Sequence, residues 1–106
     1  MQSKKKRFCY RLKLFSQYFE SDNWTDEASH IVSIHFQYLK DLTKKGIVFL
    51  AGRTVNEPMS DEDFGIVILE TNTFEEAKNI MENDPAVKGK VMHAKLYDFS
   101  IALLRK

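Results

Sequence analysis

One histidine stands out among the residues that could do chemistry, because it interrupts an apolar helical pattern. His35 shares a face at helical spacing with Ile31, Ile34 and Leu39, where a helix that only packs against a core favours leucine. An imidazole titrates near neutral pH and can accept and return a proton, so His35 is a candidate general acid or base. A core histidine bonded to a backbone carbonyl fits the same spacing, and the residues alone leave both interpretations open.

A second candidate group follows the apolar run Ile47 to Ala51. Gly52 ends this run, and Arg53 and Thr54 come directly after it. A guanidinium at the end of a strand could hold a carboxylate or phenolate oxygen, and the Thr54 hydroxyl and Gly52 would contribute to the same pocket. The ordinary alternative for Arg53 is an exposed ion pair with an acid in residues 61–63.

The spacing of the remaining reactive residues does not indicate a metal site or a nucleophile. His30 and His35 are five residues apart, so they do not share a helix face well enough to bind one metal ion. Cys9 lies in a strand-like pattern with no base nearby in the sequence. The chain also lacks a phosphate-binding glycine loop and a nucleophile elbow.

The elements that must position these residues alternate between strand and helix patterns. Alternating apolar residues predict strands over residues 8–19, 64–70 and 91–104, and the apolar run 47–51 predicts a fourth, buried strand. Thr25 is placed to cap a helix that Gly46 ends. Thr73 and Glu76 form a capping box that opens a second helix, which closes at Asp84-Pro85. Asp98 marks a bulge or an edge in the last strand.

This β-α-β-β-α-β order specifies a ferredoxin-like α+β fold, with an antiparallel sheet and both helices on one face. The other face then needs a cover, because apolar residues such as Phe15 and the run 47–50 are expected there. A second copy of the sheet is the simplest cover. We therefore expect a homodimer that associates through the sheet face.

The bulk composition predicts one globular domain over residues 1–106, with residues 1–7 as a flexible basic tail. Hydrophobic residues make up 43% and charged residues 29%, and the formal net charge is +1. This balance does not favour nucleic acid or an anionic membrane as a partner. We expect a cytoplasmic protein, because the chain has a single cysteine and no long apolar segment.

Three short segments resemble the YCII-related family of the dimeric α+β barrel superfamily. They are the helical run from His35 to Gly46, Leu50-Ala51-Gly52 at a strand end, and the run from Asp84 to Val87. Their order and spacing cover the chain from about residue 35 to residue 104. The resemblance implies two ferredoxin-like subunits packed sheet to sheet, and small cyclic or aromatic substrates handled without an organic cofactor. Arg53 stands where shorter relatives often have proline.

The resemblance also implies that His35 and Asp84 match the family's proposed acid/base pair. Asp84 would then orient His35 and stabilise its cation, although an aspartate before proline also commonly binds backbone amides at a turn. If the helix starts at Thr25, His35 lies ~15 Å along it. A direct contact therefore requires the loop with Asp84 to reach inward.

The sequence thus favours a small enzyme of lyase or isomerase type, with a ligand pocket between the sheet and the first helix. His35 would move a proton, Asp84 would orient it, and Arg53 would hold an anionic oxygen. The alternative is a module on the same fold that binds a small molecule without chemistry. A purely structural interaction domain is the third possibility.

Overall fold

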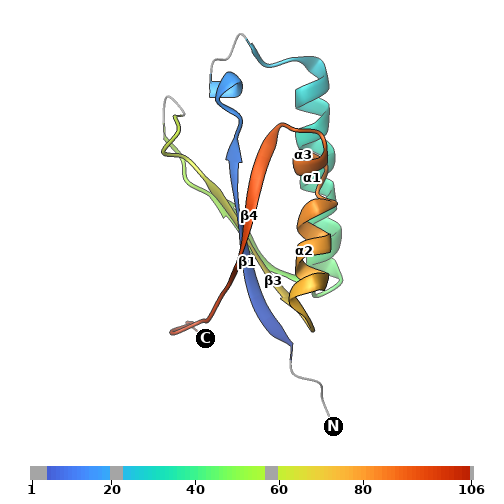
Figure 1. The fold of residues 1–106 in the computed structure, drawn as a ribbon, viewed down its shortest axis with the longest axis vertical. Coiled ribbons are helices and arrows are strands. Elements are labelled where there is room, and N and C mark those ends of the chain that lie inside the picture. Colours follow the sequence, from blue (N-terminus) through green and yellow to red (C-terminus); the bar gives the residue numbers. More distant parts are fainter. Residues whose placement is uncertain (1–4, 20–22, 57–59, 106) are drawn as a thin grey trace.

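The computed structural model describes residues 5–19, 23–56 and 60–105. Its elements are, in chain order, β1 (Lys6–Leu14), the 3-10 helix η1 (Ser16–Phe19), α1 (Asp26–Lys44), β2 (Val48–Arg53), β3 (Gly65–Thr71), α2 (Phe74–Glu82), α3 (Pro85–Lys88) and β4 (Met92–Asp98). The strands form one antiparallel sheet in the order β2-β3-β1-β4. Helices α1, α2 and α3 lie on one face of it (Figure 1). This is the predicted ferredoxin-like α+β fold.

Helix α1 begins and ends as its sequence predicts. The Thr25 hydroxyl accepts a hydrogen bond from the Ala28 amide at 3.0 Å, which satisfies an amide that lacks a helical partner. Gly46 follows the helix with a φ of 79°, a left-handed conformation that glycine adopts without a steric penalty. Of the predicted apolar stripe, Leu39 is buried, whereas Ile34 is 42% exposed.

Helix α2 is followed by a short helix that the sequence did not predict. The Thr73 hydroxyl caps α2 by accepting from the Glu76 amide, and the Glu76 carboxylate accepts from the Asn72 amide. This reciprocal arrangement is that of a capping box, with the Glu76 bond one residue earlier than usual. Asp84, two residues after the end of α2, caps α3, because its side chain accepts a hydrogen bond from the Ala86 amide.

The first and last strands are shorter than predicted. Strand β1 ends at Leu14 instead of residue 19, because the Tyr18 amide turns back to bond the Phe15 carbonyl in η1. Strand β4 ends at Asp98 instead of residue 104, since its pairing with β1 reaches Phe8 there and little of β1 remains beyond it. Alternating apolar residues continue past that point without a partner strand.

Two further expectations need correction. Strand β2 was expected to be buried, but in the single chain only Val48 is, at 4% exposure. The reason is that β2 is an edge strand and its register with β3 shifts between Val48 and Leu50. The flexible tail expected over residues 1–7 does not include Lys6 and Arg7, because these residues pair with β3, and residues 1–4 lie outside the described residues. Strand β4 is the other edge, and Asp98 ends it.

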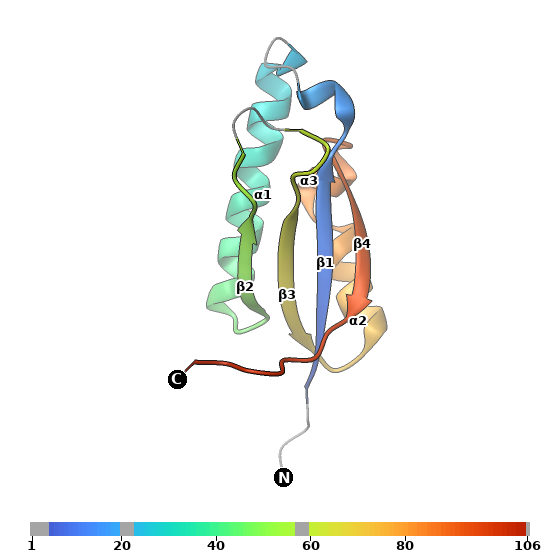
Figure 2. The same ribbon diagram turned by 90° about the vertical axis from the view of Figure 1, so that its left-hand side faces the viewer.

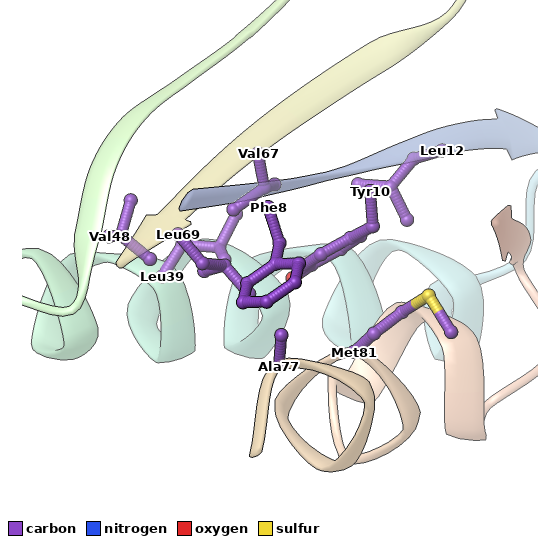
Figure 3. Packing of buried hydrophobic residues seen from close by; sticks show 9 residues of the cluster. All are labelled: Phe8, Tyr10, Leu12, Leu39, Val48, Val67, Leu69, Ala77 and Met81. Atoms are coloured by element: carbon purple, nitrogen blue, oxygen red, sulfur yellow. The ribbon is translucent and has the colours of Figure 1, made fainter. Parts of the chain in front are cut away.

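The core lies between the sheet and the helices. Phe8, Tyr10 and Leu12 of β1 point from the sheet toward Ala77 and Met81 of α2, as Figure 3 shows. Strand β3 adds Val67 and Leu69, and α1 adds Leu39. This burial is the main force that holds the helices on the sheet.

The opposite sheet face has no helix over it (Figure 2). Large apolar side chains are exposed here and at the sheet margins, among them Phe15, Leu50 and Tyr97. After β4 the chain leaves on this side and crosses the lower end of the sheet, where the Phe99 amide donates to the Arg7 carbonyl. None of the helices in the described residues is long and apolar enough to cross a membrane.

Val48 is the one residue of β2 that is buried in the core, and this yields a stability prediction. We expect Val48→Ala to lower the free energy of unfolding by about 2 kcal/mol, because two buried methyl groups are lost and a cavity remains. Val55→Ala, at a site 72% exposed, is the matched control and should change stability by less than about 0.5 kcal/mol. Urea unfolding measures both. Equal effects would contradict the docking of β2 through Val48.

Candidate active site

A pocket lies between α1 and one end of the sheet, where the sequence predicted one. Its volume is about 490 Å³. His35 lines it from α1, and Gly52, Arg53 and Thr54 line it from the end of β2 and the residue after it. Most of the other lining residues are apolar, and they come from α1, η1, all four strands and the segments between them: Leu12, Leu14, Phe19, Trp24, Val32, Phe36, Leu39, Ala51, Phe64, Ile66, Val67 and Met92.

His35 contacts Asp84 directly. Its Nδ1 lies 2.6 Å from Asp84 Oδ1, and the side chains are 11% and 0% exposed. Because an ionised carboxylate can only accept, Nδ1 carries the shared proton, and in the neutral imidazole the lone pair is then on Nε2. Among the described residues Nε2 has no hydrogen-bond partner. Every buried side-chain nitrogen or oxygen there does have one, so Nε2 is not a buried atom. Nε2 is therefore accessible from the pocket.

The turn that carries Asp84 reaches inward because α3 packs closely on α1. Gly89, which ends α3, makes this approach possible. A Cβ at this position would lie 2.9 Å from both the Pro85 carbonyl oxygen and Ile31 Cδ1, which is closer than carbon atoms pack. A side chain here would force the Ile31 side chain and the backbone at Pro85 to shift.

Asp84 accepts two more hydrogen bonds. The Tyr10 hydroxyl donates to Oδ2 at 2.8 Å, and the Ala86 amide donates to Oδ1 at 2.9 Å. Asp84 therefore binds a backbone amide at the turn, as an aspartate before proline commonly does, and contacts His35 at the same time. Tyr10 is a core residue, and the sequence analysis did not single it out as a site residue. The only signal of a further role was a hydroxyl on the buried face of a strand.

The two tyrosines near Asp84 stay protonated at neutral pH. Burial is the main cause that raises the pKa of Tyr10, and the negative charge and hydrogen bond of Asp84 raise it further. Burial and then the Asp84 charge raise the pKa of Tyr38 to about 12. Tyr38 donates its proton elsewhere, to the Ile80 carbonyl at 2.7 Å. Of the two phenols, Tyr10 is thus the one that bonds the carboxylate.

Arg53 and Thr54 line the pocket in different ways. Arg53 is exposed, and its guanidinium makes a long 3.5 Å contact with the Thr54 carbonyl. The ion pair with an acid in residues 61–63 is not formed among the described residues. The Thr54 hydroxyl gives its proton to Asp63 Oδ1 at 2.8 Å and accepts from the Phe64 amide. Its proton is therefore already used within the loop.

Asp63 is the pocket residue that sequence reasoning missed. Its carboxylate is 7% exposed and accepts from Thr54, from the Asn56 side chain at 2.8 Å and from the Ser60 amide at 3.0 Å. The Ser60 amide bond, followed by the Thr54 bond, lowers the pKa of Asp63, and the charge of Arg53 adds to this. The sequence analysis considered an acid of residues 61–63 only as an exposed partner for Arg53, so it held no signal for this closed arrangement.

The remaining histidines and the cysteine lie apart from this site. His93 packs against the Phe15 ring with centroids 5.3 Å apart, and His30 is exposed on α1. Burial raises the pKa of the Cys9 thiol, which disfavours a reactive thiolate. Within the described ranges, no group of three or more histidine, cysteine or acidic residues could hold a metal ion.

The chain is similar to a known family and to a solved structure. The model of the YCII-related domain matches residues 12–100. No curated protein matches the chain. One similar structure is 5-chloro-2-hydroxyhydroquinone dehydrochlorinase (TftG) from Burkholderia phenoliruptrix AC1100, in complex with 2,5-dihydroxybenzoquinone. The match has 22% identity and a TM-score of 0.60, and it covers 89% of this chain and 93% of that one. At this identity it shows a shared fold.

Asp63 should make the loop beside the pocket sensitive to acid. Because its pKa is lower in the folded chain, its stabilisation is complete above the ordinary value of 3.8 and is lost as the pH falls below it. We expect Asp63→Asn to lower the thermal midpoint at pH 7, and the difference from the parent to shrink toward pH 3. The exposed Asp61→Asn is the control. A constant difference across this range would contradict the role of the Asp63 charge.

Proposed function

The chain belongs to the YCII-related family of the dimeric α+β barrel superfamily, and from this premise we propose that it is a small cofactor-independent enzyme of lyase or isomerase type. Its substrate is a small cyclic or aromatic metabolite bound in the pocket between α1 and the sheet. His35 moves a proton, Asp84 orients His35, and Arg53 holds an anionic oxygen. The observation that carries this proposal is the 2.6 Å contact of a pocket-lining histidine with a fully buried carboxylate.

The geometry supports general-base chemistry at Nε2 of His35. The Asp84 carboxylate fixes the tautomer, so the lone pair is on the nitrogen that is accessible from the pocket. When Nε2 takes a proton from the substrate, the negative charge of Asp84 stabilises the imidazolium. The same nitrogen can then return the proton to another atom, which completes an isomerisation, or release it to solvent after a leaving group departs.

The pocket lining supports a flat apolar substrate with an anionic oxygen. Phe19, Trp24, Phe36 and Phe64 supply aromatic surface, on which rings stack or meet edge to face. Arg53 is the one lysine or arginine among the described lining residues. Its guanidinium matches a phenolate or carboxylate oxygen.

The similar dehydrochlorinase supports the same reaction class. Its name describes removal of hydrogen chloride from a hydroxylated aromatic ring. Such an elimination requires a base that accepts a proton while chloride departs. In this chain His35 would accept the proton. The shape of the pocket would determine which substrate, and so which leaving group, the enzyme accepts.

We further propose that the enzyme works in the cytoplasm as a homodimer joined through the helix-free sheet face. Leu50 on β2 and Tyr97 on β4 are exposed apolar residues of that face and support this assembly, because a second copy would remove their apolar surface from water. The pocket lies on the helix side of the sheet. Dimerisation would therefore cover the open face and leave the pocket accessible.

The alternative function is a binding module that holds the same ligand without chemistry. The largely apolar lining favours it, together with the closed hydrogen bonds of Thr54 and Asp63. These features leave few polar groups free to act on a substrate. The two functions differ in what His35 does once a ligand is bound.

Substitution of His35 tests the catalytic proposal. With a substrate found by screening cyclic acids and phenols, we expect His35→Ala to lower kcat by about 10²- to 10⁴-fold, because a positioned proton acceptor contributes that much. His30→Ala, on the exposed side of the same helix, should keep full activity. Circular dichroism and gel filtration check folding and assembly. A folded His35→Ala protein with full activity would remove the proposal, and saturable binding without turnover would favour the module.

Substitution of Asp84 tests the pair without a substrate. We expect Asp84→Asn to move the titration midpoint of the His35 ring to lower pH by about one unit, because a neutral amide stabilises the imidazolium less than a carboxylate. NMR of the ring protons measures the midpoint in both proteins. If His35 does not titrate, or titrates identically in the variant, the two residues do not act as a pair.

A further inference from the structure

Tyr10 has a polar group where the core requires none. Its side chain is 0% exposed and packs within the main core cluster, where Figure 3 shows it beside Phe8 and Leu12. Phe8, two residues earlier on the same strand face, fills the core without a hydroxyl. Burying a hydroxyl is unfavourable unless it is hydrogen-bonded. The Tyr10 hydroxyl meets this condition through one contact, with Asp84 Oδ2 at 2.8 Å.

We infer that Tyr10 is a positioning residue, which holds the Asp84 carboxylate in place and lowers the proton affinity of His35. This inference deepens the proposed function and concerns the same site. It extends the pair to three side chains, from β1, the turn before α3, and α1. Tyr10 does not touch the pocket, so it acts only through Asp84.

The donors of Asp84 explain the positioning role. Oδ1 accepts from His35 Nδ1 and from the Ala86 amide, while Oδ2 accepts from Tyr10. Without the Tyr10 hydroxyl, Oδ2 would be a buried charged oxygen with no hydrogen bond from the described residues. The carboxylate would then be held at Oδ1 alone, by His35 and the Ala86 amide, and its rotation about χ2 would be less restricted.

The sign of the effect on His35 follows from charge. The Tyr10 hydrogen bond stabilises Asp84 most when the neighbouring imidazole is neutral, because the imidazolium already offsets part of the negative charge. Tyr10 therefore favours the neutral form of His35 over the cation. A histidine that is neutral in the resting protein is ready to accept a proton.

The other titratable groups around Asp84 do not reproduce this effect. Helix α1 contributes Tyr38, whose hydroxyl is bonded to the Ile80 carbonyl. Helix α3 contributes a backbone amide. In the register of β4 with β1, His93 lies opposite Lys13 and Lys95 lies opposite Arg11. Lys13 and Arg11 alternate along β1 with Leu12 and Tyr10. These four charged or titratable side chains therefore face the other side of the sheet. Tyr10 is thus the phenol in hydrogen-bond contact with the carboxylate.

The test compares Tyr10→Phe with Tyr38→Phe, a matched loss of one partly or fully buried hydroxyl near Asp84. NMR titration of the His35 ring is the readout and needs no substrate. We expect the midpoint to rise by about half a unit or more in Tyr10→Phe, and to move much less in Tyr38→Phe. A midpoint that is unchanged or lower in folded Tyr10→Phe, or that moves equally in both variants, would overturn the inference.

A second variant keeps the test decisive if Tyr10→Phe does not fold. Site-specific 3-fluorotyrosine at position 10 retains the ring and hydroxyl but donates more strongly, so the His35 midpoint should fall. No change would count against the inference. If Asp84→Asn moves the midpoint and neither change at Tyr10 does, the pair stands and the role of Tyr10 falls. If the Tyr10 effects appear and no substrate is turned over, the proposed enzyme fails and this inference remains.

Discussion

The carboxylate of Asp84 is the interaction on which the arrangement of this molecule depends. It is completely buried, and it joins three parts of the fold: α1 through His35, β1 through Tyr10, and α3 through the Ala86 amide. A buried charge is tolerated only where its partners, here three hydrogen-bond donors, compensate for lost hydration. These partners must therefore stay close together, which fixes the position of α3 relative to α1 and the sheet. Gly89 allows the close approach that this requires.

The fold separates two surfaces with different tasks. The helix side of the sheet holds the core, the buried carboxylate and the pocket, and His35 lies where these meet. The opposite side holds exposed apolar side chains and charged residues in alternation. Because successive residues of a strand point to opposite faces, one strand supplies both. Strand β1 places Tyr10 beside the carboxylate and Arg11 on the open face.

A second fixed carboxylate, Asp63, lines the pocket itself, whereas Asp84 reaches the pocket only through His35. Asp63 closes the segment between β2 and β3 by accepting from Thr54, Asn56 and Ser60. Asp84 is bonded to a group that can exchange a proton with a ligand, whereas Asp63 is bonded to loop donors. In the proposed function, the first carboxylate orients the base His35 and the second shapes the pocket wall. Arg53 lies beside this wall with its guanidinium exposed.

The sequence by itself determined the order of the elements, the fold and the placement of His35. Three of the signals used are local: the alternation in β1, the Thr25 cap with Gly46, and the Thr73–Glu76 box. Local signals can be recognised in a sequence because they depend on neighbours within about four residues. The family resemblance proposed the pair of His35 with Asp84, but helix geometry alone made their contact uncertain.

Tertiary structure decided what depends on distant partners. The ends of β1 and β4, the exposure of β2, and the short helix α3 follow from where partner strands and neighbouring helices stop. The bond of Tyr10 to Asp84 joins residues 74 positions apart, and the bond of Thr54 to Asp63 joins a predicted pocket residue to an acid that was expected to be exposed. The His35–Asp84 contact spans 49 residues of sequence. Such a contact forms only when packing brings the segments together, because no short-range pattern encodes the distance between them.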